Sequence, residues 1–177
     1  MPEEKTQKEN KGKKKRALRE VGEIVFAFAV AWLGYQALAL ATGTPLPIVA
    51  VVSDSMYHQQ PHYDDWWVMR AGFYGDIGIT KEEFQDFPFR NGLSRGDLLL
   101  VVGQTPNVGD VIIYDRPGQG YTIVHRLVST TNGEYITKGD NNLAADSPIA
   151  KNQIRGKVVA AVPLLGYPRF VLFAFGV

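Results

Sequence analysis

The sequence contains no cysteine. This absence excludes a disulfide framework, a metal site built from thiolates and a cysteine nucleophile. It is compatible with either side of a membrane, because a chain without thiols is unaffected by the redox state of its compartment. At 177 residues, of which 45% are hydrophobic and 21% charged, the chain can still form one modest domain with a real core.

Apolar side chains are almost absent from residues 1–16. A segment that cannot bury apolar surface is not expected to fold, so we predict a disordered tail over residues 1–20. This tail carries eight basic and four acidic side chains, whereas the remaining 157 residues carry eleven and fourteen. The basic cluster Lys13-Lys-Lys-Arg16 could contact nucleic acid, but the acidic body offers no further basic surface. We therefore expect no nucleic-acid partner.

Lysine and arginine are missing from residue 20 to residue 69. Within this gap, residues 21–42 form an apolar run long enough to cross a bilayer as a helix, with Glu23 its only charge. A buried core helix would show a polar face, which this run lacks. A cleavable signal peptide is another alternative, since Ala39-Leu-Ala41 resembles a small-x-small site, but the apolar stretch is long for one. We predict a retained single-pass anchor in the cell membrane. The flanking positive charge places the N-terminus in the cytoplasm.

Helix-length segments are lacking between the apolar runs that follow residue 96, which excludes a βαβ fold. The runs alternate with turn residues and predict strands over 97–102, 110–114, 122–128, 134–137 and 156–162. The fold class is therefore mainly β: a small antiparallel barrel or sandwich over residues 43–167, attached to one N-terminal transmembrane helix.

Two further segments have a less regular pattern. Residues 59–94 form an aromatic-rich insertion in which Thr80-Lys-Glu-Glu83 matches a capping box, so we predict a short helix from Lys81 to about Asp86. The aromatic side chains either form a satellite core or lie in the membrane interface. Residues 168–177 are apolar but too short to span a membrane, so they either dip into the interface or pack on the domain.

A candidate nucleophile follows the β-branched run that begins at Ile48, which ends abruptly in Ser53 and Ser55. Strand ends present side chains from a rigid backbone, although serines there more often form turns. A serine nucleophile needs a base within hydrogen-bond reach. Of the three histidines, His125 interrupts an apolar strand, where a titratable group needs a partner or a purpose. A satisfied structural histidine is the alternative interpretation.

A polar element, Lys138-Gly-Asp-Asn-Asn-Leu-Ala-Ala-Asp146, supplies two carboxylates six residues apart. Calcium loops have a similar composition, but the EF-hand spacing and its closing glutamate are absent, so we expect no metal. A carboxylate that orients His125 accounts better for the pattern, and both Asp140 and Asp146 are candidates for it. Asp146 is the better one, because it lies far enough along the chain to bend back towards His125, whereas Asp140 is expected to shape the turn.

The motifs together resemble those of type I signal peptidases, in the archaeal and endoplasmic-reticulum branch. They are Ser53-Asp-Ser-Met56, Arg95-Gly-Asp97, Gly109-Asp-Val-Ile-Ile-Tyr114, Ile123-Val-His-Arg126 and Gly139-Asp-Asn-Asn142 with Asp146. The resemblance runs from the apolar helix to about Gly166. It implies that Ser55 is the acylating nucleophile, that His125 replaces the lysine base of bacterial members, and that Asp140 and Asp146 assist. Two features depart from the family: His58 stands where proline is usual, and the aromatic insertion is long.

These observations lead to one functional hypothesis and one alternative. We expect a membrane-bound serine endopeptidase that removes signal peptides from exported pre-proteins without a cofactor, with membrane lipid as a further contact and the need for accessory subunits left open. The Ser55 N–H and the Ser53 hydroxyl would form the oxyanion hole. Substrate would lie extended as an added strand against Ile48, Ala50, Val52 and Ile123. The alternative is a non-catalytic, membrane-tethered β domain that binds a partner, and it predicts that Ser55 and His125 lie far apart.

Overall fold

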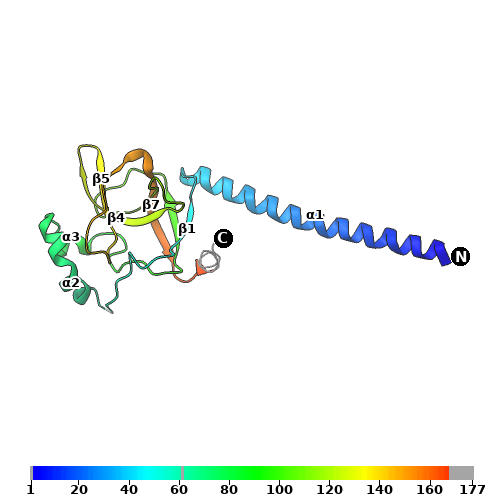
Figure 1. Ribbon diagram of the computed structural model, residues 1–177, viewed down its shortest axis with the longest axis horizontal. Helices are drawn as coiled ribbons and strands as arrows, with labels where there is room; N and C mark the ends of the chain where they lie inside the picture. Colours follow the sequence, from blue (N-terminus) through cyan, green and yellow to red (C-terminus); the bar gives the residue numbers. More distant parts are fainter. Residues whose placement is uncertain (1, 61, 168–177) are drawn as a thin grey trace. The chain divides into compact units, whose positions relative to one another are not determined.

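The computed structural model describes residues 2–60 and 62–167, which form two units. The first unit ends at Ala41 and consists of helix α1 except for its last residue, and the second begins at Thr42 and contains the sheet (Figure 1). The prediction for residues 168–177 lies outside the described residues.

Helix α1 runs from Pro2 to Thr42, and its segment Gly12–Thr42 is long and apolar enough to cross a membrane. Here the structure differs from the disordered tail expected over residues 1–20. Lysine, glutamate and glutamine are strong helix formers, and a helix that is already nucleated extends at little cost. The pairs Arg16–Glu20 and Arg19–Glu23, both at 2.9 Å and four residues apart, support this extension.

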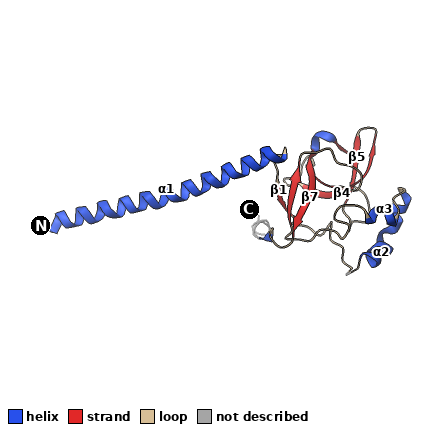
Figure 2. Cartoon of the chain, turned by 180° about the vertical axis from the view of Figure 1, so that it is seen from behind, coloured by secondary structure: helices blue, strands red, loops and turns tan. Residues whose placement is uncertain are grey.

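The second unit contains one seven-stranded antiparallel sheet, so the predicted fold class is confirmed (Figure 2). Its order is β1-β2-β7-β3-β4-β5-β6. The strands are β1 (Ile48–Ala50), β2 (Leu98–Val102), β3 (Val111–Tyr114), β4 (Ile123–Thr131), β5 (Glu134–Lys138), β6 (Ile149–Ala150) and β7 (Ile154–Val162). The short β6 and the 3₁₀ turn Lys151–Gln153 are additions to the five strands expected after residue 96.

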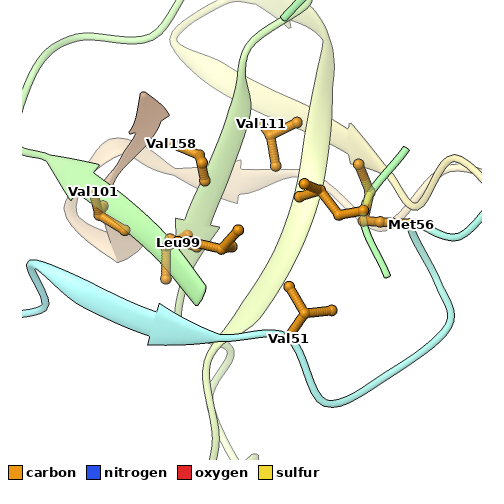
Figure 3. Close-up of a cluster of buried hydrophobic side chains, with 8 residues drawn as sticks. Val51, Met56, Leu99, Val101, Val111 and Val158 are labelled. Atoms are coloured by element: carbon orange, nitrogen blue, oxygen red, sulfur yellow. The ribbon is translucent and has the colours of Figure 1, made fainter. Parts of the chain in front are cut away.

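Strand β3 lies at the centre of the packing, and all four of its side chains are buried. Alternate residues of a strand point to opposite faces, so Val111 and Ile113 enter one apolar cluster while Ile112 and Tyr114 enter another. The first cluster also receives Met56 from the turn after β1, and Figure 3 shows Met56 beside Val111. The segment that carries Ser55 is thereby tied to the core of the sheet.

The aromatic insertion forms two helices, α2 (Tyr63–Asp76) and α3 (Lys81–Gln85), at the end of the unit opposite β1 (Figure 1). Helix α3 was predicted, and Thr80 and Glu83 form its capping box. Helix α2 was not predicted, because its apolar residues follow no clean helical period. Its buried residues belong to a cluster, comprising Trp66, Trp67, Tyr74, Ile79, Phe84 and Val128, which corresponds to the satellite-core interpretation.

Candidate active site

Ser55 lies in a tight turn that follows β1. The backbone continues the pairing of β1 as far as Val51, whose N–H donates to the Asp97 carbonyl at 2.9 Å. The Tyr57 N–H then closes the turn on the Asp54 carbonyl at 3.0 Å, and Met56 is fully buried. Anchored in this way, the Ser55 side chain remains half-exposed, with its Oγ 3.1 Å from that of Ser53.

His125 lies on β4, opposite Ile112 of β3, and its side chain is buried. Its Nδ1 lies 2.5 Å from Oδ2 of Asp146. A carboxylate can only accept in such a bond, so Nδ1 carries a proton, and in the neutral ring Nε2 then presents a lone pair. An imidazole in this tautomer can take a proton from a hydroxyl.

Besides His125 of β4, two further strands hold Asp146 through Thr137 of β5 and Tyr114 of β3. Its Oδ2 accepts hydrogen bonds from the Thr137 hydroxyl at 2.8 Å and the Tyr114 hydroxyl at 3.0 Å, and its N–H donates to the Thr137 carbonyl at 2.8 Å. Burial alone would raise the pKa of Asp146, but the hydrogen bonds from His125, Thr137 and Tyr114 outweigh it and lower the pKa. The carboxylate is therefore ionised and faces the imidazole.

Gly139 is where the Ser55 turn and the His125 ring meet. A Cβ at this position would lie 2.7 Å from the Ser55 carbonyl oxygen and 2.8 Å from Nε2 of His125. No side chain fits there, which explains why glycine is needed. The Ser55 backbone and Nε2 of His125 thus lie against one residue, whereas a binding-only domain would predict a wide separation.

Asp140 makes different contacts. Its two oxygens accept hydrogen bonds from Arg126, one from Nε at 2.9 Å and one from a terminal nitrogen at 2.7 Å. Both side chains are fully buried. His58 Nε2 lies 3.1 Å from the same carboxylate. The other donors of Arg126 bond the carbonyls of Pro88, Phe89 and Gly109. Asp140 thus closes a buried ion-pair network and is not the partner of His125.

The Asp140 network should give the fold a marked acid sensitivity. Burial raises the pKa of Asp140, but the Arg126 charge overcomes this and lowers the pKa to about 2. A depressed carboxyl pKa stabilises the folded state above the unfolded value near 3.9, and this stability is lost as the pH falls to about 2. The loss should amount to about 2 kcal/mol. Chemical unfolding of the domain between pH 5 and 2 measures it, and Asp140→Asn should remove this component.

If Asp140→Asn and the unaltered protein lost stability in parallel over that range, the acid sensitivity would arise from other carboxyl groups. Asp64→Asn provides a control, because Asp64 pairs with Lys81 on the exposed side of the insertion. Surface pairs of this kind contribute little to stability.

Lys138 was not singled out from the sequence, yet it is fully buried behind the loop that contains Gly139. Its ammonium donates to the carbonyls of Gly139 at 3.1 Å and Asp140 at 3.3 Å and lies 5.0 Å from the centre of the Tyr74 ring. Burial lowers the pKa of Lys138 to about 8. In the sequence, the only signal for Lys138 was its position directly before Gly139 in the polar element that supplies Asp140.

The residues expected to bind substrate border unpaired strand edges. Where β1 pairs with β2, the Val101 N–H donates to the Pro47 carbonyl and the Val51 N–H donates to the Asp97 carbonyl. Hydrogen-bonded and non-hydrogen-bonded residues alternate along an antiparallel pair, so the backbone groups of residues 48, 50 and 52 point away from β2. These are Ile48, Ala50 and Val52, and β1 is the edge strand of the sheet. On β4, pairing with β5 begins at Arg126, so no described strand pairs with the second edge of Ile123.

Comparisons with known proteins find relatives over most of the chain. No protein-family model matches the chain. Signal peptidase complex catalytic subunit SEC11 of Saccharomyces cerevisiae is 30% identical to it, covering 85% of this chain and 80% of the yeast protein. The protein of the same name from Pyricularia oryzae is 29% identical, covering 91% of this chain and 84% of its own length. That from Metarhizium acridum is 28% identical, covering 89% and 82%.

Proposed function

Because this chain belongs to the type I signal peptidase family, which includes these catalytic subunits, we propose that it removes N-terminal signal peptides from exported pre-proteins. It acts as a membrane-bound serine endopeptidase whose anchor is α1. The observation that carries the proposal is the His125–Asp146 pair, whose free nitrogen meets the Ser55 turn at Gly139.

In the proposed reaction, Ser55 Oγ attacks the scissile carbonyl while His125 Nε2 takes its proton. Asp146 stabilises the imidazolium and holds the ring in place. His125 then gives the proton to the leaving amine, and the peptide C–N bond breaks to leave an acyl ester on Ser55. Water activated by the same imidazole hydrolyses that ester and restores the hydroxyl.

The developing oxyanion needs two donors. The Ser55 N–H is one and the Ser53 hydroxyl is the other in this proposal, which the 3.1 Å distance between Ser53 Oγ and Ser55 Oγ supports. The substrate lies as an extended strand along Ile48, Ala50 and Val52, with Ile123 on its far side, which matches their unpaired edges. Small side chains at alternate substrate positions are what the family resemblance implies.

Cleavage of a pre-protein by detergent-solubilised protein tests the proposal, with the Ser55→Ala variant compared in parallel. Product whose new N-terminus lies at one position, absent from the variant, supports it. A binding-only domain would cleave in neither form. The relatives are named as catalytic subunits of a signal peptidase complex, so the proposal extends to accessory subunits of this chain.

Orientation is part of the same proposal and gives a separate prediction. In this proposal α1 lies in the cell membrane. The basic residues before the span favour a cytoplasmic N-terminus, so the residues after Gly43 lie on the outer side of the membrane. Protease added outside spheroplasts should therefore cut loops of the β unit and spare the N-terminal tail. Immunoblots with an epitope at each end measure this. Protection of the whole β unit, with cleavage only after lysis, would reverse the orientation.

A further inference from the structure

One face of helix α2 contacts the Ser55 turn and the loop after β5. Trp66, Arg70 and Tyr74 are spaced by four residues, so they lie along one side of the helix. The Trp66 ring stacks on His58 with centroids 3.7 Å apart. The Tyr74 hydroxyl donates to Asp140 at 3.4 Å. Each of these side chains therefore reaches one of the two segments that surround Ser55.

Arg70 makes the most direct of these contacts. Its terminal nitrogen donates to Oδ1 of Asn141 at 2.9 Å. Asn141 forms two hydrogen bonds with the Ser55 turn: its N–H donates to the Ser55 carbonyl at 2.8 Å, and its Nδ2 donates to the Asp54 carbonyl at 3.2 Å. Arg70 is thus one residue removed from the backbone that carries the serine.

The chemistry of the two side chains determines their orientation. A guanidinium can only donate hydrogen bonds, so it selects the oxygen of the Asn141 amide and turns the nitrogen towards the Asp54 carbonyl. Among the described residues, Arg70 forms no ion pair with a carboxylate, and its buried Nε has no hydrogen-bond partner. A half-buried cation with so few partners contributes little to stability, which points to a role at the Asn141 contact.

We propose that Arg70 is a positioning residue that holds the Ser55 turn through Asn141, so that the aromatic insertion supports catalysis. This inference rests on the proposed function, because it assumes that Ser55 is the nucleophile. Helix α2 does not need Arg70 to stay in place, since Trp66, Trp67 and Tyr74 are buried in the aromatic cluster. Removal of the guanidinium should therefore loosen the turn and leave the helix folded.

The test compares Arg70→Met, Asn141→Ala and the double variant in steady-state cleavage of a pre-protein by the full chain in detergent. Methionine retains the apolar stem of arginine and removes its donors. We expect kcat to fall roughly 10- to 100-fold in Arg70→Met with KM nearly unchanged, since a charged hydrogen bond and small displacements at a reacting centre have effects of this size. If Arg70 acts through Asn141, the double variant should be no slower than Asn141→Ala. Arg70→Lys, which retains a donor, should recover part of the loss.

Lys81→Met is the matched control, because it breaks the ion pair with Asp64 at the start of the same helix without touching the turn. It should retain full kcat. The inference would be overturned by a normal kcat in Arg70→Met or by additive losses in the double variant. It would also be overturned if Arg70→Met had a lowered melting temperature and regained full kcat at low temperature, because unfolding would then explain the loss. Ser55→Ala separates the two levels: if it is inactive while Arg70→Met is normal, only the positioning role fails. Cleavage by Ser55→Ala would exclude Ser55 as the nucleophile and so contradict the proposed function itself.

Discussion

Replacing Ser55 with alanine should abolish pre-protein cleavage, and His125→Ala should be equally inactive. Nucleophile and base act as a unit, so each single loss should lower kcat on the order of 10⁵- to 10⁶-fold, and the double variant should be no worse. Both variants should remain folded, because Ser55 is half-exposed and neither side chain belongs to the apolar clusters. Initial rates of pre-protein cleavage and melting temperatures measure the two effects.

Two further variants sharpen this test. His125→Lys should not restore activity, because a lysine base requires an apolar pocket that lowers its pKa, whereas position 125 faces the Asp146 carboxylate. His62→Ala is the matched control, since His62 is exposed and makes no capping bond at the start of α2. It should cleave normally. Full activity in His125→Ala would exclude His125 as the base.

Asp146→Asn and Asp140→Asn should be damaged in different ways. In a serine protease triad, replacing the orienting aspartate by asparagine lowers kcat about 10⁴-fold, because the imidazole adopts the wrong tautomer. Asp146 contacts His125 directly, so a loss of this order is expected with little change in stability. Asp140 instead neutralises the buried Arg126, and a buried charge left without its partner costs roughly 3–5 kcal/mol. Asp140→Asn should therefore mainly lower the unfolding free energy.

Measuring kcat and denaturant unfolding for both variants separates these effects. Asp97→Asn is a useful comparison, because this aspartate caps a turn through the Ser94 N–H at 2.8 Å and contacts neither His125 nor Arg126 in the described structure. Its kcat should change little. A larger drop in kcat for Asp140→Asn than for Asp146→Asn, at unchanged stability, would reverse the roles.

Local sequence determined much of this protein. The apolar run of α1, with its single charge, and the alternating apolar runs after residue 96 predict a helix and strands, because each follows directly from the period and composition of its segment. The capping box of α3 is equally local, since Thr80 and Glu83 lie on one turn. Helix α2 was missed for the opposite reason: its aromatic side chains satisfy a cluster built partly by α3 and β4, and that cluster has no local signature.

Candidate residues could be named from the sequence, but only part of their pairing could. Both carboxylates were identified, and the structure assigns Asp146 to His125 and Asp140 to Arg126. Sequence separation favoured Asp146 for His125 and left Asp140 to shape the turn. It could not identify Arg126 as the partner of Asp140, because that contact depends on how the loop after β5 bends.

Tertiary structure decided the pairing through the geometry of β4. His125 and Arg126 are neighbours in the chain, and successive side chains of a strand point to opposite faces of the sheet. The two side chains therefore meet different surroundings: one faces Tyr114, Thr137 and the Ser55 turn, and the other faces the aromatic insertion. The sequence determined which residues could react, and the strand pleat together with the path of one loop decided which of them meet.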